Sequence, residues 1–147
     1  MDNYTLVRPE HLNHHGFLFG GSMLKWVDEY SWLVASLDFP GCTLVTMAMD
    51  NIVFKEAVHC GSILRFNVLP LRQGVSSVTY RVHVYADEPG AMAEKLVFTT
   101  TITFVRVTAK GKKAPLPVRT AYRSQYPDPD GAACFDQVVS PDREPTD

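Results

Sequence analysis

The sequence predicts an α+β domain in which an antiparallel sheet of about five strands wraps around one long central helix. A single long stretch carries the 3.6-residue apolar period of a helix, and the pattern then changes to a period of two over four consecutive segments. Strands that follow one another directly favour an antiparallel sheet over alternating parallel units. The length of 147 residues suits one compact domain.

The composition is that of an ordinary globular chain and excludes several function classes. With 46% hydrophobic and 20% charged residues the chain can build a core, and a net charge of -2 gives no general attraction to nucleic acid. No apolar stretch approaches the roughly 18 residues of a membrane helix, and the N-terminus lacks a secretory signal pattern, so we expect a cytoplasmic protein without a membrane partner. Cys42, Cys60 and Cys134 are far apart, which argues against a disulfide framework or a zinc site.

The helical period runs from residue 21 to about residue 37. Its apolar positions cover most of the circumference, as in a buried helix: Met23, Leu24, Trp26, Val27, Tyr30, Leu33, Val34 and Leu37. Lys25 and Glu29 fall on a narrow polar stripe. Asp28 lies roughly 90° from the centre of that stripe, so we expect its carboxylate where the polar and buried faces meet, an unusual position for an acid.

Four strands are predicted after the helix, over residues 44–54, 63–72, 75–86 and 93–107, because these segments are rich in β-branched and aromatic residues and are separated by turn signals. A hairpin is predicted at residues 72–75, a turn at residues 87–90, and a further short strand near residues 4–7. Residues 1–120 are predicted to form the domain. Residues 121–147, which are rich in Pro and Asp, are predicted to form a C-terminal tail.

Gly20 and Gly21 come just before the helix, whose first-turn amides lack intrahelical partners and carry a partial positive charge. Glycine lets a ligand approach the backbone closely, so these amides could polarise a carbonyl and stabilise an oxyanion. The alternative is a tight turn that needs flexible residues.

Asp28 follows Gly20 by eight residues, or about two helical turns, which is near enough for one bound acyl group to touch both regions. A half-buried carboxylate beside Trp32 could act as a general base on water or as a nucleophile on a thioester, since partial desolvation disfavours its charged form. The alternative is a structural acid paired with Lys25 or hydrogen-bonded to Ser31.

Asn13 stands in a polar loop before the glycines, where its amide could orient a water or bind a carbonyl, although a turn or cap residue is the simpler interpretation. His14 and His15 are candidates for a base or a metal ligand. No Asp, Glu or Cys nearby completes a metal-ligand spacing, and no Ser or Cys nucleophile motif accompanies them, so we expect no metal.

The chain shares a larger set of residues with one known family: Asn13, Gly16, Phe19, Gly20, Gly21, Asp28, Val45, Thr46, Asp50, Phe54, residues 58–61, residues 74–77, Phe104, Val105, Gly111, Lys112 and residues 115–117. Through these residues it resembles the hot-dog-fold acyl-CoA thioesterases, in the acyl-CoA hydrolase branch that includes the brain-type enzymes and short bacterial relatives. The similarity covers about residues 7–117. Any one piece is weak, whereas the combination is fairly specific.

The resemblance implies a hot-dog fold and the hydrolysis of acyl-CoA to a free acid and coenzyme A without a metal or redox cofactor. It implies that Asp28 supplies the base or nucleophile, that Asn13 comes from a partner subunit to complete the site, and that Gly20 or Gly21 offers its amide to the thioester carbonyl. It also implies that two sheets join edge to edge, so we expect at least a homodimer and leave a larger homo-oligomer open.

The chain departs from the family pattern around the expected coenzyme A site. Val75 replaces an arginine that often occupies the hairpin, and Ala57 and Ser62 replace a usual proline and aspartate. Substrate binding is assigned to the rest of the hairpin and to a basic run that could contact phosphates instead: Gly74, Ser76, Ser77, Arg106, Lys110, Lys112 and Lys113. The alternative for the basic run is a solvated loop.

An apolar acyl pocket would have to come from the helix and sheet, with Trp26, Tyr30, Trp32, Met47 and Phe54 as candidates that could equally be plain core. Two other functions stay open. A hot-dog hydratase or dehydratase would need a catalytic histidine with an acid, which His14 or His15 with Asp28 could imitate, although the helix itself carries no histidine. A non-catalytic acyl-CoA-binding or oligomerising module is supported by the loss of the hairpin arginine.

Overall fold

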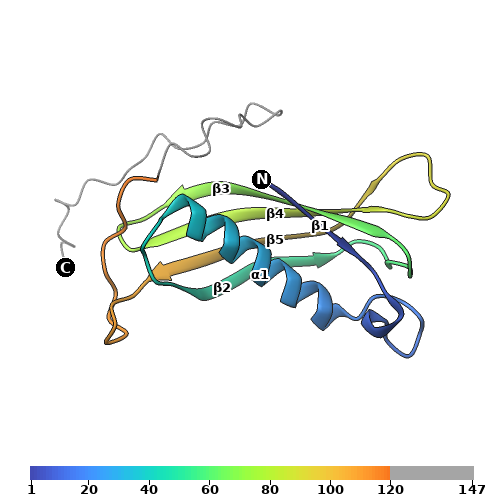
Figure 1. The fold of residues 1–147 in the computed structure, drawn as a ribbon, viewed down its shortest axis with the longest axis horizontal. Helices are drawn as coiled ribbons and strands as arrows, with labels where there is room; N and C mark the ends of the chain where they lie inside the picture. The colour runs from blue at the N-terminus through green and yellow to red at the C-terminus, as the bar shows by residue number, and fades with distance from the viewer. Residues whose placement is uncertain (120–147) are drawn as a thin grey trace.

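The computed structural model describes residues 1–119 and contains one long helix and five strands in this part of the chain (Figure 1). In chain order the elements are β1 (Asp2–Leu6), the 3-10 helix η1 (Pro9–His11), α1 (Gly20–Asp38), β2 (Leu44–Phe54), β3 (Ile63–Gln73), β4 (Ser77–Asp87) and β5 (Lys95–Arg106). The predicted helix and strands are confirmed, with ends that differ by at most two residues. The predicted tail at residues 121–147 lies outside the described residues.

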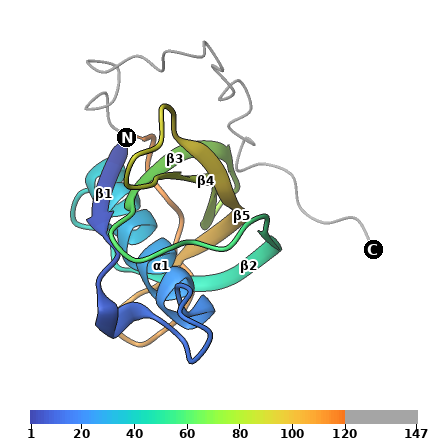
Figure 2. The same ribbon diagram turned by 90° about the vertical axis from the view of Figure 1, so that its right-hand side faces the viewer.

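The five strands form one sheet in the order β1-β3-β4-β5-β2, and every neighbouring pair is antiparallel. Viewed end-on, the sheet curves around α1, so that β1 and β2 lie on opposite flanks of the helix (Figure 2). These two strands are also the edges of the sheet. The predicted antiparallel sheet around a central helix is therefore confirmed.

The core lies between the helix and the concave face of the sheet. Val27 and Val34 of α1 and Phe66, Ile102 and Phe104 of the sheet are fully buried members of one cluster. This arrangement follows from the sequence, because a helix that is apolar over most of its circumference has to be covered on several sides. The curved sheet supplies that cover.

The turn between β3 and β4 and the chain after β5 meet at one end of the sheet. The Gly74 amide donates to the Ser77 carbonyl at 2.8 Å, which closes the predicted hairpin. The Leu116 amide donates to the Val75 carbonyl at 2.8 Å, and the Gln73 side chain donates to the Pro117 carbonyl at 3.0 Å. The segment that follows β5 is thus tied to the domain as far as the described residues extend.

Within the described residues, α1 is not apolar enough over its length to be a candidate for a bilayer-crossing helix.

Candidate active site

The start of α1 presents backbone amides that the protein itself leaves free. Phe19 is the N-cap residue and makes no side-chain capping hydrogen bond, and the first turn contains no acidic residue. Within residues 1–119, neither the Gly20 nor the Gly21 amide donates a hydrogen bond. An oxygen that carries partial negative charge would therefore find unoccupied donors and the positive end of the helix dipole here.

Close packing explains the two glycines better than turn flexibility does. Neither Gly20 nor Gly21 is among the residues with positive φ, so the interpretation as a turn that requires flexible residues is wrong. A Cβ on Gly21 would lie 2.6 Å from Cε1 of Phe19, and a Cβ on Gly20 would lie 3.4 Å from Cζ of Phe54. The glycines allow two aromatic rings to pack against the first turn of the helix.

Asp28 has a hydroxyl as its partner. The Thr46 hydroxyl of β2 donates to Oδ1 of Asp28 at 2.5 Å, and the side chain of Asp28 is half-buried, as predicted. The structural alternatives are wrong, because within the described residues Asp28 forms neither an ion pair with Lys25 nor a hydrogen bond with Ser31. A carboxylate that keeps one oxygen fixed and is not neutralised by a cation remains available as a base or nucleophile.

Sequence reasoning from the helix alone missed Thr46. It lies 18 residues from Asp28 and on a different element, so no local spacing connects the two. The available signal was a threonine near the start of the strand that directly follows the helix, since that strand must run back alongside it. A period-two pattern does not say which residue of the strand faces which residue of the helix.

The two halves of the predicted site are far apart along one helix. Eight residues separate Gly20 from Asp28, which corresponds to a rise of about 12 Å. A donor to an oxyanion has to lie about 3 Å from it, and a base acts within hydrogen-bond reach or through one water. The amides of Gly20 or Gly21 and the carboxylate of the same chain therefore cannot act on one carbonyl group.

Asn13 organises its own loop. Its side-chain oxygen accepts the amide N–H groups of His15 at 2.9 Å and Phe17 at 3.2 Å, and its backbone N–H donates to the Phe17 carbonyl at 2.7 Å. This is the turn role that the sequence left as the simpler interpretation. The side-chain NH₂ group of Asn13 makes no hydrogen bond within the described residues, so it stays available as a donor.

His14 and His15 are exposed, and their ring centroids lie 3.8 Å apart. Among residues 1–119, no third side chain of a metal-binding type joins them to form a cluster.

The substrate-binding candidates of the hairpin and the basic run come together at one end of the sheet. The Arg106 amide donates to the Ser76 carbonyl at 2.8 Å, and the Arg106 side chain donates to the Pro115 carbonyl at 2.7 Å. Lys110, Lys112 and Lys113 are exposed in the turn that follows. In Figure 1 this turn (orange) lies at the opposite end of the molecule from the start of α1, so one chain does not bring these lysines to Gly20.

Three of the five candidates for the acyl pocket are not core residues. Met47, Phe54 and Trp32 are 55%, 52% and 43% exposed, whereas Trp26 is buried and Tyr30 is half-buried. The core interpretation therefore holds for Trp26 and is wrong for the three exposed side chains. Two of those three, Met47 and Phe54, lie on the edge strand β2.

Comparison with known proteins gives consistent matches over this part of the chain. The family model described as the thioesterase superfamily matches residues 15–93. Acyl-coenzyme A thioesterase 11 of Mus musculus is 32% identical over 100 residues, which make up 68% of this chain and 17% of that protein. The chain thus spans less than a fifth of the length of that curated relative.

Solved structures match a larger share of both chains. A hexameric hotdog fold thioesterase of Campylobacter jejuni superposes with a TM-score of 0.71 at 31% identity, over 78% of this chain and 88% of that one. An acyl-CoA hydrolase from Staphylococcus aureus, in complex with butyryl coenzyme A and coenzyme A, gives a TM-score of 0.69 at 27% identity over 80% of this chain and 71% of that one. The predicted hot-dog fold is confirmed.

Proposed function

The chain belongs to the thioesterase superfamily, and from this membership we propose that it hydrolyses acyl-CoA thioesters to a carboxylic acid and free coenzyme A. The observation that carries the proposal is the Asp28 carboxylate, which is half-buried, held by Thr46 and free of any cation partner in the described residues. Two of the relatives named above, from Mus musculus and Staphylococcus aureus, are an acyl-coenzyme A thioesterase and an acyl-CoA hydrolase, which supports the same substrate class.

In the reaction, the acyl carbon gains a bond to an oxygen and loses its bond to sulfur. The amide of Gly20 or Gly21 donates to the carbonyl oxygen and stabilises the negative charge that develops there. Asp28 either removes a proton from the attacking water or attacks the acyl carbon itself, in which case water releases the acid in a second step. The sulfur leaves as a thiolate and takes up a proton to give free coenzyme A.

The active site is shared between two copies of the chain in this proposal. One chain supplies Asn13 and the glycine amides, and the other supplies Asp28 with Thr46. The rise of about 12 Å between Gly20 and Asp28 supports this division, because a two-fold axis can place the start of one helix beside the middle of another. The free NH₂ group of Asn13 would then face the substrate carbonyl or the attacking water.

The edge strand β2 is the surface through which we propose that two copies join. Val45, Met47, Val53 and Phe54 are each more than 40% exposed along this strand, and the outer edge of β2 has no strand partner within the described residues. An unpaired apolar edge strand promotes aggregation unless another chain covers it. The matched structure from Campylobacter jejuni is hexameric, which supports a homo-oligomer of two or more copies here.

We assign phosphate contacts to Lys110, Lys112 and Lys113, with the hairpin residues Gly74, Ser76 and Ser77 beside them. Because these residues lie far from Gly20 in one chain, they would meet the nucleotide part of coenzyme A while its acyl end lies in the shared site. The cytoplasmic location stays a prediction.

The test is a thiol-release assay with acyl-CoA substrates from acetyl to palmitoyl, with a protein blank because Cys42 and Cys60 are free thiols. The wild-type protein should release coenzyme A, and Asp28→Asn should lose roughly 100-fold or more of kcat, since a positioned base or nucleophile contributes that much. Glu29→Gln is the matched control, because this exposed neighbour on the same helix should keep normal turnover.

Each rival function predicts a different result in this assay. A hydratase would leave the thiol bound and change the acyl chain, which mass spectrometry of the product detects. A binding module would release no thiol from any substrate. Normal turnover in a folded Asp28→Asn protein would remove Asp28 from the mechanism.

A further inference from the structure

The middle of the sheet's outer face consists of short polar side chains around one arginine. This face is turned away from α1, as Figure 2 shows, and it carries the residues of β4 and β5 that alternate with the buried core residues. The outer face is defined here as Thr79, Arg81 and His83 of β4, Thr99, Thr101 and Thr103 of β5, and Asp50 of β2. None of the residues assigned to the thioesterase reaction belongs to it.

Arg81 is a half-buried cation without a partner in the described part of the chain. It forms neither an ion pair nor a hydrogen bond there, and its Nε atom is shielded from water. A charged donor that is shielded and unpaired destabilises a fold, because its interaction with water is lost and nothing replaces it. An acceptor from outside this chain would remove that cost.

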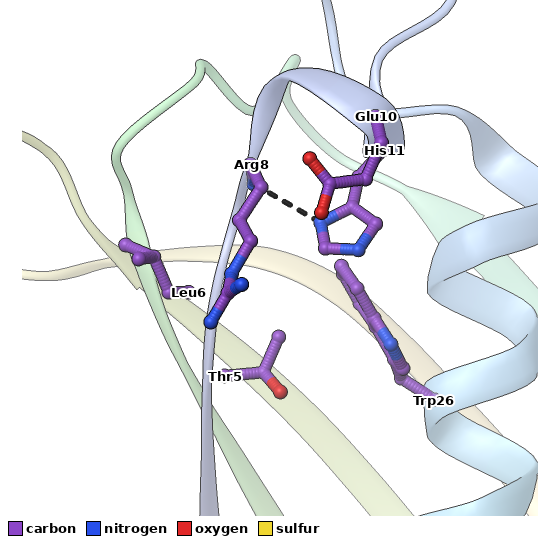
Figure 3. A pocket seen from close by; sticks show the side chains of 6 residues that line it. All are labelled: Thr5, Leu6, Arg8, Glu10, His11 and Trp26. Atoms are coloured by element: carbon purple, nitrogen blue, oxygen red, sulfur yellow. Dashed lines mark hydrogen bonds between the residues drawn. The ribbon is translucent and has the colours of Figure 1, made fainter.

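The other arginines of residues 1–119 are either paired or exposed. Three of them have a carboxylate or carbonyl acceptor: Arg65, Arg106 and Arg119. Arg72 is exposed, and so is Arg8, which stands beside the hollow between β1, η1 and α1 (Figure 3), so water can solvate both. Among these arginines, Arg81 alone combines partial burial with the lack of an acceptor.

The outer face also carries an acid without a cation. Asp50 is exposed on the edge strand β2, and its carboxylate has no ion-pair partner between residues 1 and 119. The strand register places Thr101 of β5 beside Arg81 on one side and beside Asp50 on the other. Neighbouring strands lie about 4.8 Å apart, so the two unpaired charges stand on one line across the sheet, about 10 Å apart along the backbone plane.

A second copy laid on this face would pair both charges. A two-fold axis that runs along β5 at Thr101, midway between the two sheets, places β4 of one copy above β2 of the other. Arg81 of each copy then faces Asp50 of the other, because rotation about this axis keeps their shared position along the strands. Packed sheets lie about 10 Å apart, a gap that a long arginine and a short aspartate can bridge while the threonines between them stay clear.

We propose that the outer face is an interface between two copies of this chain, held by two equivalent ion pairs of Arg81 with Asp50. An arginine among few other charges is typical of the centre of a protein interface. His83 adds no charge at neutral pH, because burial and the charge of Arg81 lower its pKa. Joining through β2 uses the edge of the sheet and leaves this face open, so the two interfaces together build an assembly larger than a dimer.

Charge reversal tests the pairing. Arg81→Glu and Asp50→Arg each place like charges opposite one another at both contacts, so each variant alone should sediment at roughly half the wild-type mass or less. An equimolar mixture of the two variants should restore the larger assembly, because every contact between them joins an acid and an arginine. High salt should weaken the wild-type assembly, since it screens the pairs. Lys25→Glu, on α1 and so on the other side of the sheet, is the control and should keep the wild-type mass.

Melting temperatures within a few degrees of the wild-type value check that the variants are folded. If Arg81→Glu is unstable, Asp50→Arg carries the test alone, because it changes an exposed residue; it should lose the assembly, and Asp50→Asn should weaken it less. A wild-type particle no larger than either variant, or a mixture no larger than its two components, would overturn the inference. Loss of assembly in Arg81→Glu but not in Asp50→Arg would place another anion at Arg81 and overturn the pairing. Sedimentation needs no substrate, so the result stands whether or not the protein hydrolyses acyl-CoA.

Discussion

The hydrogen bond between Thr46 and Asp28 joins the two elements that would form one half of the active site. It holds one oxygen of the Asp28 carboxylate in place and so fixes the rotamer of the side chain. The unusual position of Asp28 on the helix was predictable from the helical period. Its partner Thr46 was not predictable from the helical period, because the contact depends on how α1 and β2 are aligned along each other.

Thr46→Val removes the hydroxyl and keeps the shape of the side chain. We expect kcat to fall about tenfold or more with a smaller change in KM, because a misplaced base affects the chemical step more than substrate binding. Thr46→Ser, which keeps the hydroxyl, should restore most of the activity; equal losses in both variants would assign Thr46 a packing role only.

His83 gives the folding stability a dependence on pH. Burial lowers the pKa of His83 below its ordinary value, and the charges of Arg81 and Lys55 lower it further. The unfolded chain therefore binds a proton at His83 that the folded chain does not bind, once the pH falls below about 6.5. Stability is full above that pH and is lost as the pH falls toward the folded-state pKa.

His83→Gln should remove this part of the pH dependence. Urea unfolding at about pH 8 and pH 5.5 gives the free energy of unfolding of each protein under both conditions. The wild-type protein should lose more stability on acidification than His83→Gln does, and His14→Gln, which changes an exposed ring, should behave like the wild type. A variant that loses as much stability as the wild type would show that other groups cause the acid sensitivity.

At the scale of elements, the boundaries of α1 and β2 to β5 followed from period and turn signals, while the burial of single residues did not. The period predicts which residues share a face, but it does not say whether that face meets the core of the same chain or the surface of another. Met47 and Phe54 illustrate the difference, because both fit a core strand and both are more than half exposed on β2. The same limit applies to Trp32 on α1.

Variants of the turn after β5 test whether its lysines bind the phosphates of coenzyme A or are only solvated surface charges. Replacing Lys110, Lys112 and Lys113 with Gln should raise KM for acyl-CoA several-fold and leave KM for an acyl N-acetylcysteamine thioester unchanged, because only the first substrate carries phosphates. Added salt should reproduce the effect in the wild-type protein, since exposed charges are screened. Lys25→Gln, on the exposed stripe of α1, is the control; equal changes in KM for both substrates would assign the turn to solvation.

At the scale of the whole molecule, one chain is an incomplete enzyme in this proposal. Its sheet ends in an apolar edge at β2, and the glycine amides and the carboxylate lie too far apart to act together. The family resemblance predicted that two sheets join edge to edge, whereas the helical spacing led us to expect that one bound acyl group could touch both Gly20 and Asp28 of one chain, which the rise of about 12 Å contradicts for a single carbonyl group. A second copy related by a two-fold axis would cover the edge and complete two equivalent sites at once.

The shared site can be tested by mixing two inactive proteins, Asn13→Ala and Asp28→Asn. If Asn13 of one chain meets Asp28 of its partner, a mixed dimer contains one site with both lesions and one site with neither, so it should recover roughly half of the wild-type activity by symmetry. If each site is built within one chain, every site keeps one lesion and mixing gives only the average of the two parents.

The proteins carry different affinity tags, are unfolded and refolded together, and are purified over both tags in turn, so that only mixed assemblies enter the thiol-release assay. Two samples of the same variant, tagged and treated in the same way, are the control for refolding. Mixed assemblies that hold both tags and show no activity above the parents would contradict the shared site and leave Asp28 to act within its own chain.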